Sequence, residues 1–273
     1  MAGFGGRSRP KRPQGTDHRN WPQELAVKPT LLIPARLAAT RLPAKPLADI
    51  AGVPMIVRVM RQAMAAELGP VVVAAGEREI VAVVEAAGGK AVLTDPALPS
   101  GSDRIHAALE AFDPEGRHDV VVNLQGDLPA LDPGQIRAVV AALEESGADI
   151  ATLAAQITDP AERDNPHVVK AVVAWQPDGR LGRALYFTRA TAPSGDGPLF
   201  HHVGIYAYRR AALTRFVTLP PSPLEKREKL EQLRALEAGM SIAVARVDSV
   251  PLSVDTEADL AKANQFFARK PSS

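Results

Sequence analysis

Three cationic side chains follow the first apolar run of the chain, in the loop IPARLAATRLPAKPL at residues 33–47. They are Arg36, Arg41 and Lys45, and the loop contains no glycine. Loops that bind phosphates through backbone amides use glycines to let the phosphates approach, so here the side chains must bind the anion. Cations after the carboxyl end of a first parallel strand suit a ligand with several negative charges, such as a triphosphate. The alternative is a solvated basic loop.

Two aspartates lie at positions that suit metal ligands. Asp127 ends the segment Gln125-Gly126-Asp127, which directly follows an apolar run, and Asp255 precedes the last segment with helical periodicity. Mg²⁺ prefers one or two carboxylates together with phosphate oxygens, and a carboxylate at the carboxyl edge of a sheet can supply one. The alternatives are a turn former for Asp127 and a helix N-cap for Asp255. Both can bind one ion only if the sheet brings them together.

A third group of polar residues lies in the second half of the chain. Arg189 follows Tyr-Phe-Thr, a His-His pair precedes Gly204, and Glu231-Gln232 lies within a Leu-rich segment. An arginine can bind a carboxylate in a bidentate manner, so Arg189 is a candidate for binding an acidic substrate. The histidines are equally compatible with a structural role, and Glu231-Gln232 with an exposed helix face.

The elements that must position these residues follow an alternating pattern from Thr30 onward. Short apolar runs alternate with segments of helical length, which predicts a parallel α/β sheet of Rossmann type. We expect strands at 30–34, 71–75, 91–94 and 120–124, and helices at 54–69, 77–87, 102–112 and 133–145. The second half is less regular and predicts a mixed sheet, with strands at 150–156, 168–174, 184–187, 202–208 and 242–247 and helices at 224–238 and 256–268.

The chain divides into a basic leader and one domain. Residues 1–29 carry 6 basic and 2 acidic side chains, are rich in Gly and Pro, and have no apolar run. They predict a disordered leader outside the fold rather than a signal peptide. An electrostatic tether to a membrane or nucleic acid is the less favoured alternative. Residues 30–273 predict a single domain, since 273 residues with 46% hydrophobic side chains can bury a sizeable core.

Composition excludes several classes of protein. A formal net charge of +1 gives no field that would favour nucleic acid as a partner. The chain has no cysteine, which excludes disulfide scaffolds, Cys-ligated metals and cysteine nucleophiles. No apolar stretch approaches the roughly 18 residues of a membrane span, so we expect a soluble protein with no membrane contact.

Several strings together resemble the 3-deoxy-manno-octulosonate cytidylyltransferases, also called CMP-Kdo synthetases, from about Leu31 to Ala268. The strings are IPARLAATRLPAKPLADIAGVPMI, SGSDRI, VVNLQGDLP, NPHVVK, ALYFTRA, HHVGIYAYR, SPLEKREKLEQLR and VDTEADL. The resemblance implies an α/β nucleotidyltransferase fold, with a mixed, mainly parallel central sheet and a smaller subregion for sugar binding and dimerisation. It further implies Mg²⁺-dependent transfer of CMP from CTP to the sugar acid Kdo for lipopolysaccharide biosynthesis, by a cytoplasmic homodimer.

The resemblance also implies a role for each matching residue. Arg36, Arg41 and Lys45 match cations that bind the triphosphate, and Ser100 and Gly101 match the loop near the nucleotide. Asp127 and Asp255 match Mg²⁺ ligands, and together with Arg41 and Lys45 they form the expected catalytic set. The positions that match contacts to the sugar acid are Gln125, Arg189, His202, Tyr206, Glu231 and Gln232.

The chain departs from the family pattern at three places, which leaves two alternatives open. Leu128 replaces an acid, a typical histidine before Ser100 is missing, and the loop before Asp255 lacks the usual glycines. One alternative is cytidylyl transfer to another sugar acid, such as 8-amino-Kdo or a sialic acid. The other is a non-catalytic protein that binds the nucleotide or the sugar acid.

Overall fold

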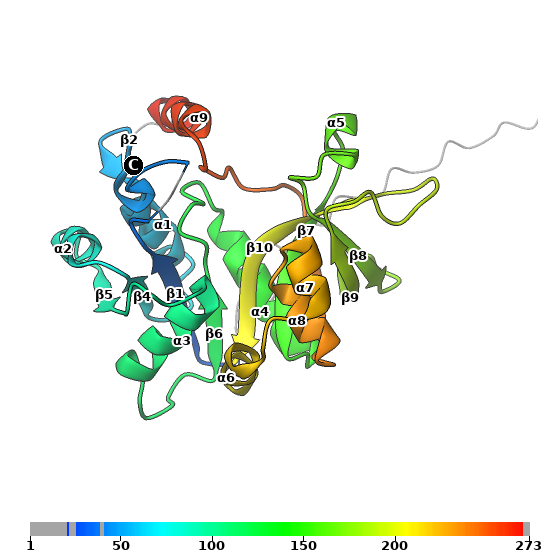
Figure 1. Ribbon diagram of the computed structural model, residues 1–273, viewed down its shortest axis with the longest axis horizontal. Helices are drawn as coiled ribbons and strands as arrows, with labels where there is room; N and C mark the ends of the chain where they lie inside the picture. The colour runs from blue at the N-terminus through cyan, green and yellow to red at the C-terminus, as the bar shows by residue number, and fades with distance from the viewer. Residues whose placement is uncertain (1–20, 22–25, 39–40, 270–273) are drawn as a thin grey trace, which may run out of the picture.

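A nine-stranded mixed sheet with the order β5-β4-β1-β6-β10-β7-β11-β9-β8 forms the centre of the computed structural model, which describes residues 21, 26–38 and 41–269 (Figure 1). The strands are β1 (Pro29–Ala35), β4 (Val71–Ala75), β5 (Lys90–Leu93), β6 (Val120–Asn123), β7 (Ile150–Gln156), β8 (Lys170–Trp175), β9 (Leu181–Thr188), β10 (Phe200–Arg209) and β11 (Ile242–Val247). A separate hairpin joins β2 (Asp49–Ile50) to β3 (Val53–Pro54).

The first half of the sheet is parallel and the second half is mixed, as the alternating and then irregular pattern predicts. β5, β4, β1 and β6 run in one direction, so their carboxyl ends share one edge. β10 lies antiparallel between β6 and β7, and β11 is parallel to β7. β9 is antiparallel to β11 and to β8, and β8 also meets β10 at one position.

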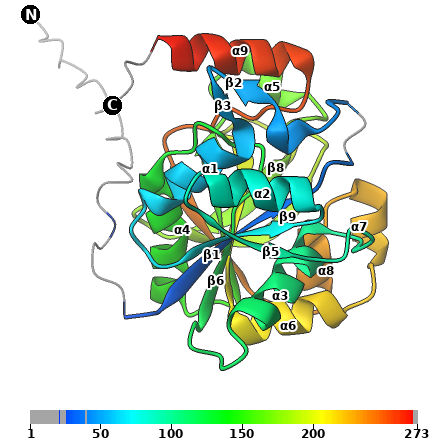
Figure 2. The ribbon, with the colours of Figure 1, turned by 90° about the vertical axis from the view of Figure 1, so that its left-hand side faces the viewer.

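Helices cover both faces of the sheet, and each face has its own core (Figure 2). Helices α1 (Met55–Met64), α2 (Arg78–Ala86) and α4 (Pro133–Ser146) pack on one face. Helices α3 (Gly101–Phe112), α6 (Arg210–Thr218), α7 (Pro223–Glu228) and α8 (Gln232–Glu237) pack on the other. The short α5 (Pro160–Arg163) follows β7. With both faces covered, strands such as β4 are buried at every position, which explains their continuous apolar runs.

The final helix, α9 (Glu257–Ala268), lies on neither face of the main sheet. Figures 1 and 2 show it beside the β2–β3 hairpin, where the segment after β11 has crossed the sheet edge to reach it. Thr256 caps this helix in a capping box with Asp259, so Asp255 is not its N-cap. No helix in the described ranges is long and apolar enough to cross a membrane.

The amino-terminal boundary of the fold differs from the one predicted at residue 30. β1 already begins at Pro29, and the Trp21 side chain is 3% exposed within the core of the α4 face. The guanidinium of Arg180 lies 4.1 Å from the centre of the Trp21 ring, and the Ala26 amide donates to Glu144. Residues 1–29 are therefore not wholly outside the fold, because an aromatic anchor offsets the polar composition around it. The prediction for residues 1–20 and 22–25 lies outside the described part of the chain.

The single helix predicted over residues 224–238 is wrong, because the chain forms α7 and α8 with a break between them. Lys229 adopts a left-handed conformation with φ of 56° and ends α7. The Glu228 carboxylate accepts hydrogen bonds from the Thr188 hydroxyl and the Arg189 amide. These tertiary contacts outweigh the local helix propensity, and they move Glu231 and Gln232 from the middle of a helix to the start of α8.

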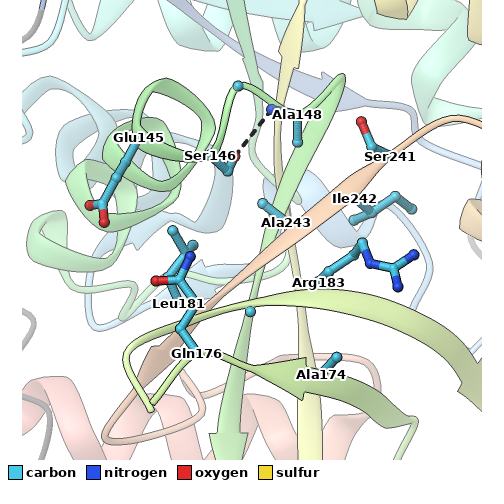
Figure 3. Close-up of a pocket in the computed structure, with 12 residues that line it drawn as sticks. Glu145, Ser146, Ala148, Ala174, Gln176, Leu181, Arg183, Ser241, Ile242 and Ala243 are labelled. Atoms are coloured by element: carbon cyan, nitrogen blue, oxygen red, sulfur yellow. Dashed lines mark hydrogen bonds between the residues drawn. The ribbon is translucent and has the colours of Figure 1, made fainter. Parts of the chain in front are cut away.

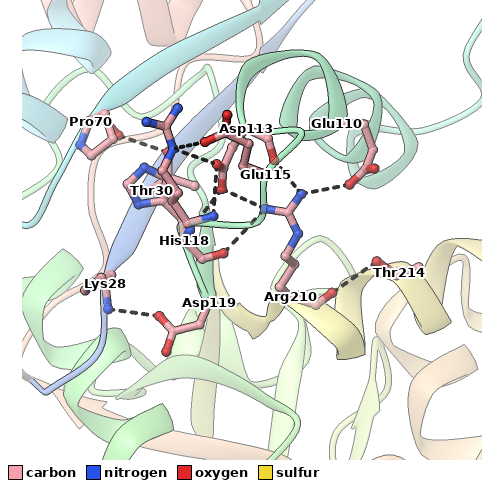
Figure 4. A network of polar contacts seen from close by, with 11 residues as sticks. Lys28, Thr30, Pro70, Glu110, Asp113, Glu115, His118, Asp119, Arg210 and Thr214 are labelled. Atoms are coloured by element: carbon pink, nitrogen blue, oxygen red, sulfur yellow. Dashed lines mark hydrogen bonds and ion pairs between the residues drawn. The ribbon is translucent and has the colours of Figure 1, made fainter.

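A network of charges closes the amino edge of the parallel strands (Figure 4). The Asp113 carboxylate is 1% exposed and accepts a hydrogen bond of 2.8 Å from Arg210 at the start of α6. It also accepts from the backbone amides of Arg117 and His118, just before β6. Burial acts to raise the pKa of Asp113, but these hydrogen bonds and the charges of His118 and Arg210 lower it overall. The network joins the α3–β6 connection to α6.

Replacing Asp113 with asparagine (D113N) should lower the free energy of unfolding by about 3 kcal/mol at pH 7, because Arg210 then loses a buried counter-ion. Since the folded-state pKa of Asp113 lies below its usual value of 3.8, this contribution is present above that pH and is lost as the pH falls through the folded-state pKa. Urea denaturation at pH 7 and at pH 3 measures both effects. Glu110 binds the same arginine but is 55% exposed, so E110Q should change stability by less than about 1 kcal/mol. Equal losses at both pH values would contradict this prediction.

Candidate active site

The carboxyl edge of the parallel strands carries the residues that follow β1 and β6. The two strands pair in parallel, so the loop after Ala35 and the segment Gln125-Gly126-Asp127 emerge side by side. A Cβ atom at Gly126 would lie 2.9 Å from the Pro34 carbonyl oxygen, which explains the glycine at this position. This close approach fixes Gln125 and Asp127 next to the cationic loop.

Lys45 lies between the two predicted metal ligands. Its ammonium nitrogen is 2.8 Å from Asp127 Oδ2 and 2.8 Å from Asp255 Oδ1. Burial acts to lower the pKa of Lys45, but the charges and hydrogen bonds of both aspartates outweigh it and raise that pKa above its usual value. Arg41 adds a longer ion pair of 3.3 Å to Asp255 and is 65% exposed. The four residues of the expected catalytic set thus form one cluster.

A small apolar core and one backbone hydrogen bond hold the three segments of this cluster together. Its buried members include Leu42 from the cationic loop and Val254 beside Asp255. The Val254 amide also donates to the carbonyl oxygen of Asp127 at 3.0 Å. From α9, the Phe267 ring packs on this core and lies 4.0 Å from the guanidinium carbon of Arg58. The C-terminal helix therefore positions Asp255, although 128 residues separate that aspartate from Asp127.

The two carboxylates suit a hard divalent cation whose remaining ligands come from a substrate. Both approach the Lys45 nitrogen, so they cannot be farther apart than twice that 2.8 Å distance. Asp127 and Asp255 are 25% and 37% exposed, so solvent and phosphate oxygens can reach them. Within residues 21, 26–38 and 41–269, no group of three or more His, Cys, Asp or Glu side chains could hold a metal alone. Two carboxylates with substrate oxygens are a typical Mg²⁺ set, and the metal role of these aspartates stays a prediction.

A pocket of about 150 Å³ lies next to this cluster. Four predicted residues line it: Arg36, Ser100, Gly101 and Gln125. Ser100 caps α3, because its hydroxyl accepts from the Asp103 amide. The positive end of the α3 dipole therefore adds to the charge of Arg36 at the pocket, which favours an anion there. The pocket brings Gln125 to the predicted nucleotide residues, although the predicted role of Gln125 is a contact to the sugar acid.

Arg104 also lines this pocket and is not among the predicted site residues. The side chain is 2% exposed, and it donates to the Thr94 hydroxyl at 2.6 Å and to the carbonyl oxygens of Asp95 and Pro96. Burial lowers the pKa of Arg104 below its usual value. The arginine thus holds the segment before Ser100, the same segment that lacks the family's histidine. Its position in SGSDRI, one helical turn after Ser100, is the only signal in the sequence.

His202 and Tyr206 lie in a row of aromatic rings on β10. The His202 ring is 5.5 Å from Tyr206 and 4.9 Å from Phe187. Burial and the charge of His201 lower the pKa of His202 to about 3, so its ring is neutral at pH 7. Its Nε2 is 3.0 Å from the Thr152 hydroxyl, which donates its single proton to a backbone carbonyl. On this hydrogen-bond pattern we assign the ring proton of His202 to Nε2, which leaves Nδ1 as an acceptor.

Glu231 lies between α8 and the start of α3. Its Oε2 accepts a hydrogen bond of 2.9 Å from the Ser102 hydroxyl, while its buried Oε1 has no hydrogen-bond partner. Burial raises the pKa of Glu231, and burial together with the charges of Tyr208 and Glu231 raises the pKa of Tyr206. The neighbouring Gln232 is 7% exposed. Neither residue lies on the exposed helix face that was the alternative for this pair.

Arg189 follows β9, and its guanidinium donates hydrogen bonds to two backbone carbonyls. Its Nε donates to the Glu228 carbonyl oxygen at 2.9 Å, and one terminal nitrogen donates to the Pro166 carbonyl oxygen at 3.1 Å. Backbone carbonyls thus fix the orientation of the guanidinium without neutralising its charge. A fixed, positively charged guanidinium can bind a carboxylate through its remaining N–H groups.

Leu128 replaces the acid that the family pattern has beside Asp127, and its side chain is 7% exposed in the core of the α4 face. The replacement therefore adds an apolar core contact.

A second hollow, of about 360 Å³, lies at the opposite edge of the sheet, where β7 and β11 begin (Figure 3). Glu145, Arg183 and Ile242 are among the residues that line it, and none of the predicted site residues does. It lies away from the converging cations and carboxylates described above.

Comparisons with known proteins agree with this architecture. A family model described as cytidylyltransferase matches residues 30–242. The chain is 66% identical over 248 residues to the 3-deoxy-manno-octulosonate cytidylyltransferase of Parvibaculum lavamentivorans, an alignment that covers 91% of this chain and 96% of that protein. It is also 66% identical over 239 residues to the protein of that name from Rhodospirillum centenum, covering 88% of this chain and 93% of the relative.

Solved structures are similar to this fold. CMP:2-keto-3-deoxy-manno-octonic acid synthetase complexed with CTP matches with a TM-score of 0.82 and 36% identity, covering 89% of this chain and 99% of that chain. A cytidylyltransferase from Leptospira borgpetersenii shares the fold with a TM-score of 0.60 at 14% identity, covering 90% of this chain and 89% of its own.

Phe267→Ala should loosen the segment that carries Asp255, because it removes the ring that packs on Arg58 and on the small core. A loss of about 1 to 2 kcal/mol of local stability would make the Val254 and Asp255 amides exchange with solvent roughly tenfold faster. Hydrogen exchange measured by NMR gives both rates. Gln265 lies on the same helix and is exposed, so Q265A is the control and should leave them unchanged. Equal rates in F267A and wild type would show that α9 does not hold this segment.

Proposed function

The chain belongs to the 3-deoxy-manno-octulosonate cytidylyltransferases, and from this premise we propose that it transfers CMP from CTP to the anomeric hydroxyl group of 3-deoxy-D-manno-octulosonate (Kdo). The products are CMP-Kdo, which serves lipopolysaccharide biosynthesis, and pyrophosphate. The observation that carries the proposal is the cluster of Lys45, Asp127 and Asp255 beside the pocket of Arg36 and Ser100. A triphosphate and its counter-ion need this combination of cations and carboxylates.

The nucleotide half of the reaction uses Arg36, Arg41 and Lys45 as cations for the triphosphate. They neutralise charge that accumulates on the pyrophosphate as it leaves, which is how proteins mainly accelerate phosphoryl transfer. Asp127 and Asp255 would hold Mg²⁺, which when bound supplies further neutralisation of the phosphate oxygens. Ser100 and Gly101, at the start of α3, contact the nucleotide.

The bonds that change lie at the α-phosphorus of CTP. The anomeric oxygen of Kdo forms a bond to this phosphorus, and its proton passes to water. The bond from the α-phosphorus to the oxygen that bridges to the β-phosphorus breaks, and pyrophosphate leaves with the electron pair. No covalent intermediate with the chain is needed, so its residues act by orienting both reactants in line.

The sugar half uses the residues around the β9 and β10 strands. Arg189 binds the Kdo carboxylate with the N–H groups that its backbone contacts leave free. His202, neutral at pH 7, offers an acceptor nitrogen to a sugar hydroxyl. The remaining contacts to the sugar acid come from Gln125, Tyr206, Glu231 and Gln232.

Kdo is favoured over the other acceptors because relatives with 66% identity carry the Kdo name. The non-catalytic alternative is not favoured, because a protein that only binds a ligand has no need for two carboxylates beside a triphosphate site. We also propose a homodimer in the cytoplasm, by analogy with the family.

Purified protein should release pyrophosphate from CTP when Kdo and Mg²⁺ are both present, and D127N should lower kcat by at least about 100-fold with an unchanged circular dichroism spectrum. A coupled pyrophosphate assay measures the rate.

The same assay with 8-amino-Kdo and a sialic acid tests the acceptor, and a kcat/KM for either that exceeds the Kdo value by about 100-fold would displace Kdo. Binding of CTP by calorimetry without any turnover would establish the non-catalytic alternative instead.

Lys45→Met should separate metal binding from nucleotide binding. In the absence of nucleotide the ammonium balances both aspartates, so K45M should bind Mg²⁺ alone more tightly, by about tenfold or more. The KM for CTP should rise in the same variant, because a triphosphate cation is lost. Calorimetric titration with Mg²⁺ measures the first effect and steady-state kinetics the second. Weaker Mg²⁺ binding in K45M would show that Asp127 and Asp255 do not form the ion site.

A further inference from the structure

Lys170, the first residue of β8, has a completely buried side chain. Its ammonium nitrogen donates to three backbone carbonyl oxygens: Asn165 at 2.7 Å, Val168 at 2.8 Å and Arg189 at 3.2 Å. Burial lowers the pKa of Lys170, and the charges of Asp164 and Glu162 oppose that shift. A buried ammonium is costly unless every donor is used, and here three acceptors match its three hydrogens.

The backbone of Lys170 joins the strands that carry the proposed sugar-acid residues. It pairs with Thr188 on β9, directly before Arg189, and with His201 on β10, directly before His202. Val169, directly before Lys170, continues this link, because its carbonyl oxygen accepts a hydrogen bond from the His202 amide. Lys170 therefore lies where β8, β9 and β10 meet.

The segment before β8 connects the two cations. Lys170 holds its ends through the carbonyls of Asn165 and Val168, and Arg189 donates to the carbonyl of Pro166 between them. Lys170 also holds the carbonyl of Arg189 itself. Loss of the ammonium would free this segment and the Arg189 backbone at the same time.

We propose that Lys170 is a positioning residue for the sugar acid: by holding residues 165–168 and the Arg189 carbonyl, it keeps the Arg189 guanidinium in the orientation that binds the carboxylate. The inference rests on the proposed function, because it takes Arg189 as the group that binds the acid. Lys170 itself is too deeply buried to contact substrate.

The test compares Lys170→Met with Lys90→Met, an exposed lysine that is likewise the first residue of its strand, β5. K170M should raise the KM for Kdo by about tenfold or more, because a charge-assisted network that orients Arg189 is lost, and leave the KM for CTP within about twofold. K90M should change neither constant. In an R189K background, K170M should add little further loss, since both substitutions disrupt the same contact.

Two results would overturn the inference separately from the proposed function. If wild type turns over Kdo but a folded K170M has an unchanged KM for Kdo, Lys170 has only a structural role. If the KM values for CTP and Kdo rise together, the effect is general and again contradicts the inference. If wild type releases no pyrophosphate with Kdo, the proposed function fails and the inference fails with it.

Hydrogen exchange on the unmodified protein tests the inference if K170M does not fold. Kdo should slow exchange of the backbone amides of residue 165, residues 167–170 and Arg189, because binding of the carboxylate by Arg189 stabilises the segment that Lys170 holds. An analogue of Kdo whose carboxylate is reduced to an alcohol should not. Equal protection by both compounds, or protection by neither, would overturn the role of Lys170.

Discussion

The contact between the Lys45 ammonium and two aspartates determines the geometry of the candidate active site. Asp127 and Asp255 would repel each other without a cation between them, and Lys45 supplies it at 2.8 Å from each. Each charge comes from a different segment, so this contact forms only when the β1 loop, the β6 end and the segment before α9 have all reached the same sheet edge. The small core around Leu42 and Val254 fixes that arrangement without adding charge.

The two edges of the parallel strands are built differently, and the difference leaves one of them available for ligands. At the amino edge, the carboxylate oxygens of Asp113 accept hydrogen bonds from Arg210 and from backbone amides. The charges of Asp113 and Arg210 are therefore balanced within the chain. At the carboxyl edge, Arg36 and Arg41 remain largely exposed and lie beside a pocket or an aspartate. Charge that the fold does not balance internally is what can bind an anion.

The sequence predicts the parallel half of the sheet and the charged edge because both depend on local patterns. Buried strands such as Val71–Ala75 are read from their apolar runs, and Asp127 is read from its position after β6. The break at Lys229 could not be predicted, because the local sequence favours a helix and the contacts of Glu228 with Thr188 and Arg189 come from a distant strand. Trp21 was missed for the same reason, since its core contacts lie far along the chain. The family resemblance supplied the residue roles, which neither periodicity nor spacing could give.

On the proposed assignment, the two substrates meet cations of different kinds. A triphosphate carries several charges and a divalent counter-ion. The protein cations that bind it can therefore remain exposed, as Arg41 does at 65%, and adjust to the bound triphosphate. A sugar acid brings a single carboxylate, and an exposed, mobile guanidinium would lose conformational entropy to bind it. Arg189 has lost that entropy on folding, because Glu228 and Pro166 already hold it. Backbone carbonyls suit this purpose, since they fix a cation and leave its net charge for the ligand.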